Sequence, residues 1–133
     1  MTNSITIMLI DDNEDDNFFH SRVIKKTLDN PEIIVFEDAE KALAYFEEIK
    51  DTKNVNPDLI LLDINMPGMN GWEFLEAYKR LDPSIQLASI VVMLTTSENP
   101  DDFERAKEHN ITTDFKIKPL TTEMVEEMIK NHL

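Results

Sequence analysis

Short apolar runs alternate with longer amphipathic segments from one end of the chain to the other. The first residues of these runs lie roughly 25 to 30 residues apart, which is the length of one strand, one helix and two turns. The pattern predicts five strand–helix units, with strands at residues 5–10, 33–36, 59–62, 89–94 and 113–117. This repeated order favours a parallel sheet with helices on both faces.

The segments between and after these runs have apolar residues at helical spacing, so each is predicted to turn one stripe toward a core. The predicted core-facing residues are Phe19, Val23, Ile24 and Leu28; Leu43, Phe46 and Ile49; Trp72, Leu75 and Tyr78; and Leu120, Met124, Val125, Met128 and Ile129. The sequence therefore predicts an α/β fold, doubly wound around a five-stranded parallel sheet, in a single domain of 133 residues.

Acidic residues outnumber basic ones: 27 Asp and Glu oppose 13 Lys and Arg, a formal net charge of −14. Nucleic acids and anionic membrane surfaces are polyanions, so we expect neither as a direct partner. The absence of cysteine excludes disulfides, thiolate metal sites and cysteine nucleophiles. The run 5–10 is too short for a signal peptide, and no segment approaches the ~20 apolar residues of a membrane span. We expect a soluble cytoplasmic protein.

Polar residues follow four of the five predicted strands directly. In a parallel sheet the carboxyl ends of the strands meet at one edge, and ligands bind there. We therefore expect these residues to converge although they are far apart in sequence. They are Asp11 and Asp12 after the first strand, Asp63 after the third, Thr95, Thr96 and Ser97 after the fourth, and Lys118 after the fifth.

This combination of residue types points to phosphoryl transfer onto a carboxylate. Three clustered carboxylates repel one another unless a cation lies among them, and hard oxygen ligands favour Mg²⁺. A lysine and a hydroxyl supply positive charge and a donor for phosphoryl oxygens, while an aspartate can itself be the nucleophile. Gly68 and Gly71, the two glycines of the chain, are expected to give the loop after Asp63 backbone conformations closed to other residues.

Four motifs in this order resemble those of bacterial two-component response-regulator receiver domains: "LIDDNEDD", "LLDINMPGMNGWEF", "VVMLTTS" and "DFKIKPL". The resemblance covers about residues 5 to 131. It implies a flavodoxin-like sheet of order 2-1-3-4-5, and a single receiver domain over residues 1–133 without an output domain. It also implies a signalling protein rather than an enzyme, acting by phosphorelay or by docking on a downstream protein target.

The resemblance implies that Asp63 accepts a phosphoryl group from a histidine kinase or a histidine phosphotransfer protein. Asp12 would bind Mg²⁺ directly and Asp11 mainly through water. The Asp63 carboxylate and the backbone carbonyl of Asn65 would complete the protein's share of the ligands.

Lys118 would contact the phosphoryl group, and its peptide bond to Pro119 would be cis. Thr95 would hydrogen-bond a phosphoryl oxygen and move the loop that follows it. Phe115 occupies the switch-aromatic position, and phosphorylation would let its ring bury itself. The face remodelled in this way comprises the helix before strand 113–117, that strand and the last helix.

The chain departs from the common family pattern at two positions. Phe115 replaces the commoner Tyr, so a signal that needs the phenolic hydroxyl is unavailable. Thr96 stands where Ala is frequent, and we expect its bulk to narrow access to the phosphoryl group. Asn65 and Ser97 occupy the positions that tune dephosphorylation, and both are polar here.

Other polar residues have simpler interpretations. Glu14, Asp15 and Asp16 are expected to begin the first helix, where acids favour the helix dipole. Asp101, Asp102 and Glu104 are interpreted in the same way. The three histidines lack metal-ligand spacing, so we expect them to be solvated or near helix ends: His20, His109 and His132.

Three competing functions fit less well or stay open. A phosphatase with an aspartyl-phosphate intermediate would need an acidic residue two positions after the nucleophile, where Asn65 stands. A flavin-binding electron carrier would need a phosphate-binding loop after the first strand, where residues 11–16 would repel phosphate. A phosphorylation-independent interaction domain of receiver fold remains the alternative.

Overall fold

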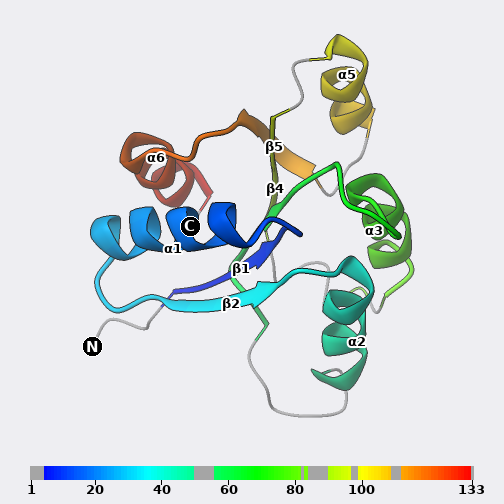
Figure 1. Cartoon of the computed structure of the whole chain (residues 1–133), viewed down its shortest axis with the longest axis horizontal. Coiled ribbons are helices and arrows are strands. Elements are labelled where there is room, and N and C mark those ends of the chain that lie inside the picture. The colour runs from blue at the N-terminus through cyan, green and yellow to red at the C-terminus, as the bar shows by residue number, and fades with distance from the viewer. Residues whose placement is uncertain are drawn as a thin grey trace.

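The structure, a computed structural model, describes residues 5–49, 56–81, 83, 90–96, 99–108 and 112–132. Its centre is a five-stranded sheet with helices on both sides (Figure 1). None of the helices in these ranges is both long and apolar enough to cross a bilayer.

The strands confirm the predicted order and direction. They pair in parallel in the order β2-β1-β3-β4-β5. Each lies within one residue, at either end, of the run that predicted it. Their bounds are β1 Thr6–Ile10, β2 Glu32–Phe36, β3 Leu59–Leu62, β4 Ile90–Thr95 and β5 Thr112–Ile117.

Alternate residues of the central strands point to opposite faces and form two cores. One core joins Met8, Ile60 and Met93 to helices α2, α3 and α5. The other joins Leu9 and Leu61 to helices α1 and α6. Figure 1 shows α1 beside α6, with α2 and α3 across the sheet. The helix bounds are α1 Glu14–Thr27, α2 Ala39–Ile49, α3 Gly71–Tyr78, α5 Pro100–Glu108 and α6 Thr122–His132.

The predicted core stripes hold for α3 and α6 but are wrong at one residue of α1. Phe19 is 48% exposed, whereas Val23 and Ile24 are buried. The buried face of α1 also includes Asn17 and His20, two polar residues that an apolar pattern does not reveal. Phe19 lies outside this buried face and points outward. The side chain of Ile49, predicted to face the core, lies outside the described set.

The start of α3 brings the loop after β3 close to the strand end. Asn70 caps the helix in a reciprocal capping box with Glu73, which fixes where the helix begins. Gly71 lies so close to the backbone of Asp63 that a Cβ at position 71 would sit 2.4 Å from the Asp63 carbonyl oxygen. Gly68 has a φ of 74°, a conformation that other residues rarely adopt. The two glycines therefore serve different needs, and only Gly68 confirms the predicted conformational role.

Candidate functional site

Asp11 leaves β1 in a fixed and buried position. Its backbone N–H donates to the carbonyl of Phe36 on β2 at 3.1 Å, and its own carbonyl accepts from the Asn17 amide at 2.8 Å. Its carboxylate accepts from the backbone N–H of Asn13, the residue that caps α1. Asp11 is 4% exposed, while the neighbouring Asp12 is exposed. The first strand thus ends in one buried carboxylate and one solvent-facing carboxylate.

Asp63 lies at the end of β3 beside them and is 7% exposed. Its backbone N–H donates to the carbonyl of Ile10 at 3.0 Å, which ties the ends of β1 and β3 together. Its carboxylate accepts hydrogen bonds from the Thr95 hydroxyl and from the backbone N–H of Ile64. The buried carboxylate is therefore held by donors rather than stranded in the core.

Thr95 and Lys118 complete the site from the last two strands. Thr95 is fully buried, and its carbonyl accepts from the backbone N–H of Lys118 at 2.8 Å. The Lys118 ammonium lies 2.6 Å from Asp11 Oδ2 and 3.8 Å from Asp63 Oδ1. The peptide bond from Lys118 to Pro119 is cis, as predicted.

Three carboxylates gather where the sequence predicted a metal. One oxygen from each of Asp11, Asp12 and Asp63 lies within 4.8 Å of the others. Within the described part of the chain, the Lys118 ammonium is the cation that pairs with this group, so three carboxylates face one positive charge. Hard oxygen ligands in this number, with one side open to water, suit Mg²⁺ or a similar divalent cation.

Burial and neighbouring charges shift the pKa values of two ionisable groups in the site. Burial raises the pKa of Asp63, and the nearby Asp11 carboxylate raises it further, against the opposing effects of Lys118 and Thr95. Burial alone would lower the pKa of Lys118. The hydrogen bonds to Asp11 and Asp16 outweigh that effect, so the pKa of Lys118 is raised and its charge is secure. The ionised form of Asp63 is thus disfavoured by its surroundings, while the neighbouring Lys118 stays positively charged.

Comparison with known proteins identifies the family. Residues 7–130 match the family of the response regulator receiver domain. This chain belongs to the receiver family. Among curated relatives, the response regulator Rcp1 of Synechocystis is 35% identical over 97 residues, which are 72% of this chain and 65% of Rcp1. The chain thus spans just under two thirds of the length of that relative.

Solved structures agree with this assignment. A two-component response regulator from Cytophaga hutchinsonii superposes with a TM-score of 0.87 at 29% identity, with 96% of each chain covered. The phosphorylated cyanobacterial phytochrome response regulator RcpA gives 0.77 at 28% identity, covering 96% of this chain and 90% of RcpA. The Mn²⁺-bound form of Rcp1 also gives 0.77 at 28%, covering 96% and 93%.

The receiver site contains residues whose position the sequence did not predict. Asp16, interpreted as a helix-start acid, does lie in the first turn of α1, but its carboxylate also accepts from the Lys118 ammonium at 2.8 Å. A side chain at the third helical position points back toward the helix start, and that geometry could have signalled the contact.

His20 corrects a second expectation, because it is 3% exposed rather than solvated. Burial lowers its pKa, and the nearby Lys118 charge lowers it further. His20 is therefore a buried side chain next to the site, and its surroundings favour the uncharged imidazole. The side chains of His109 and His132 lie outside the described residues.

The remaining predicted receiver residues lie on β5 and near the strand ends. Phe115 is half-buried on β5, and its ring meets that of Phe103 on α5 edge to face at 5.6 Å. Asn65 and Thr96 have exposed side chains near the strand ends. Ser97 lies outside the described residues.

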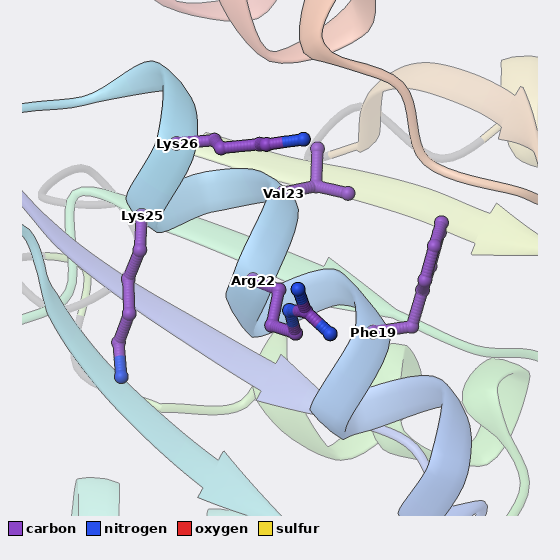
Figure 2. A pocket seen from close by; sticks show the side chains of 5 residues that line it. All are labelled: Phe19, Arg22, Val23, Lys25 and Lys26. Carbon is purple, nitrogen blue, oxygen red and sulfur yellow. The ribbon is translucent and has the colours of Figure 1, made fainter.

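One exposed surface of the receiver lies along α1, the helix that follows Asp11 and Asp12. Phe18 and Phe19 are 67% and 48% exposed, and the Arg22 guanidinium lies 5.9 Å from the centre of the Phe18 ring. Next to them is a hollow of about 460 Å³. Figure 2 shows its lining, with Lys25 extending away from Phe19. The lining residues are Phe19, Arg22, Val23, Lys25 and Lys26.

Proposed function

We propose that this receiver accepts a phosphoryl group on Asp63 in the presence of Mg²⁺. An Asp63 carboxylate oxygen would form a bond to phosphorus while the bond from phosphorus to the donor atom breaks, with the electron pair leaving on the donor. The donor would be a phosphohistidine of a kinase or phosphotransfer protein. The observation that carries the proposal is the buried Asp63 carboxylate held between the Thr95 hydroxyl, Lys118 and two further aspartates.

Each of these groups has a place in the proposed reaction. Asp11, Asp12, Asp63 and the carbonyl of Asn65 would hold Mg²⁺, which neutralises charge on the transferring phosphoryl group. Lys118 and Thr95 would bind phosphoryl oxygens from the opposite side. The phosphorylated form of RcpA and the Mn²⁺-bound form of Rcp1 support both parts of the proposal by similarity.

The proposed output is a change in the surface made by α5, β5 and α6. If the Thr95 hydroxyl moves to the phosphoryl group, space opens behind it toward β5. Phe115, half-buried against Phe103, would move into that space and change the surface. The chain would then dock on a downstream protein or pass the phosphoryl group on. It would act in the cytoplasm as a signalling protein rather than as an enzyme with its own substrate.

The phosphodonor would bind along α1. This helix begins at the acidic cluster, so a partner lying along it could bring a phosphohistidine to Asp63. Its exposed Phe18 and Phe19 offer apolar contact, and Arg22, Lys25 and Lys26 offer positive charge within a chain of net charge −14. A partner surface with apolar and acidic residues fits this pattern.

Intact mass spectrometry tests the proposal. The protein is incubated with Mg²⁺ and acetyl phosphate beside an Asp63→Asn variant. We expect one added phosphoryl group on the wild type and none on the variant. No adduct on the wild type, together with no binding of beryllofluoride as a phosphoryl mimic, would instead favour a phosphorylation-independent interaction domain.

A further inference from the structure

The ammonium of Lys118 donates hydrogen bonds to two carboxylates, those of Asp11 and Asp16, and forms only a longer ion pair with Asp63. Lys118 Nζ lies 2.6 Å from Asp11 Oδ2 and 2.8 Å from Asp16 Oδ2, but 3.8 Å from Asp63 Oδ1. The Lys118 side chain is 8% exposed and that of Asp16 is 36% exposed. The lysine that would bind a phosphoryl group is therefore already hydrogen-bonded to Asp11 and Asp16 in the unmodified protein.

We propose that Asp16 is a positioning residue that restrains Lys118, so that phosphoryl binding must first pull the ammonium from it. This inference rests on the proposed function of Asp63. It assigns Asp16 a task beyond favouring the start of α1, for which Glu14 and Asp15 in the same turn are already suited.

The restraint follows from the charges in the site. A charge-assisted hydrogen bond at 2.8 Å to a nearly buried ammonium is strong, and it is directional. Mg²⁺ and Lys118 would both interact with the Asp11 carboxylate, so a bound cation would weaken the interaction between Asp11 and Lys118. The Asp16 carboxylate is not among the three clustered acids, so its hydrogen bond with Lys118 would persist. It becomes the main competitor of the phosphoryl oxygens for Lys118.

The release of Asp16 is also feasible. Its side chain is partly exposed, so water can solvate the carboxylate once the lysine leaves. A fully buried partner would instead be left as an unpaired charge and would block the exchange. The Asp16–Lys118 interaction is thus strong enough to compete with phosphoryl oxygens, and exposed enough to be broken when they bind.

The test is the affinity for beryllofluoride in the presence of saturating Mg²⁺. It is measured by titration calorimetry and by the NMR shift of the Thr95 amide. We expect Asp16→Asn to bind about fivefold more tightly than the wild type, the size expected for losing one partly exposed ion pair. Asp16→Ala should shift in the same direction. Asp15→Asn is the matched control, since it removes the same charge from the same helical turn, whereas the hydrogen bond from Lys118 goes to Asp16.

A double-mutant cycle with Lys118→Met separates restraint from general charge effects. In the Lys118→Met background, Asp16→Asn should change affinity no more than Asp15→Asn does. An unchanged or weaker affinity in Asp16→Asn would overturn the restraint, and so would an equal gain in Asp15→Asn. If the wild type does not bind beryllofluoride at all, the proposed function fails and the inference fails with it, a result distinct from the other two.

Discussion

Gly71 holds the receiver site together at the scale of a single residue. Any Cβ there would lie 2.4 Å from the Asp63 carbonyl oxygen and 2.9 Å from the Ile64 Cα, both of them backbone atoms that cannot swing aside. A larger residue must therefore push α3 away from the end of β3. Asp63 lies at that end and is held there by its hydrogen bonds.

We expect Gly71→Ala to lower the free energy of unfolding by about 3 kcal/mol, since the clash involves backbone on both sides. Gly68→Ala is the matched comparison. Its Cβ would meet only Glu40 Oε1 at 4.0 Å, so the loss of about 1 kcal/mol comes from the left-handed φ alone. Urea unfolding of both variants measures the difference, and an equal loss would contradict the close-approach argument.

Asp63 carries a stability effect whose sign depends on pH. Its pKa is raised in the folded protein by burial and by Asp11, so the folded state binds the proton more tightly than the unfolded chain does. That contribution to stability is present at acid pH and is lost as the pH rises through the folded pKa. Above that pKa and without metal, the ionised Asp63 therefore destabilises the fold.

Asp63→Asn should raise the free energy of unfolding at pH 7 without Mg²⁺ by about 1 kcal/mol, because it removes a charge that burial and the Asp11 carboxylate disfavour. The gain should shrink as the pH falls and wild-type Asp63 takes up its proton. Thermal unfolding across a pH series measures both effects. A variant less stable than the wild type at pH 7 in the absence of metal would contradict the account.

At this scale the sequence predicted which residues meet but not how they pair. Asp11, Asp63, Thr95 and Lys118 could be predicted because strand ends converge in any parallel sheet. The contact from Asp16 to Lys118 and the burial of His20 depend on the rotation of α1 about its axis. The buried face of α1 includes two polar residues, Asn17 and His20, and apolar periodicity does not identify them.

At the scale of elements, a polar contact joins α5 to α3. The Trp72 indole N–H donates to Asp102 Oδ1 at 3.3 Å, and the Arg105 guanidinium lies 4.9 Å from the centre of the Trp72 ring. Trp72 itself is buried, as predicted. Asp102, predicted as a helix-start acid, lies in the first turn of α5 and also anchors that helix.

Asp102→Asn should lower the free energy of unfolding by about 1 kcal/mol, because the Trp72 indole keeps only a weaker, uncharged acceptor. Asp101→Asn is the control, since Asp101 lies in the same first turn of α5. Trp72 is the one tryptophan of the chain, so its fluorescence during denaturation reports the contact directly. Equal stability of the two variants would argue against the anchor.

The strands and helices themselves were well predicted, because each apolar run is short, continuous and separated from the next by an amphipathic segment. Strands buried on both faces need such runs, and β1 and β3 are buried along their whole length. The misplaced residue, Phe19, belongs to a helix with a weaker apolar stripe. Element type was thus set by local pattern, and orientation by contacts across the fold.

At the scale of the whole molecule, the net charge of −14 makes the fold sensitive to ions. General screening by salt should raise stability modestly, because like charges repel across the surface. A site among Asp11, Asp12 and Asp63 adds a specific effect on top of this screening.

At equal ionic strength, MgCl₂ should therefore raise the melting temperature of the wild type more than NaCl does, by linkage to binding of the folded state. Asp12→Asn, which removes an exposed carboxylate of the cluster, should lose most of this additional gain. Differential scanning calorimetry of both proteins measures it. The same response to both salts would mean that no metal binds among these acids.

Locating the phosphoryl group tests most directly whether Asp63 is the phosphoryl acceptor. The protein is treated with Mg²⁺ and acetyl phosphate, reduced with borohydride to convert the acyl phosphate to homoserine, digested and sequenced by tandem mass spectrometry. We expect conversion at Asp63 alone. Conversion at Asp11, Asp12 or Asp16 instead, with Asp63 intact, would contradict it.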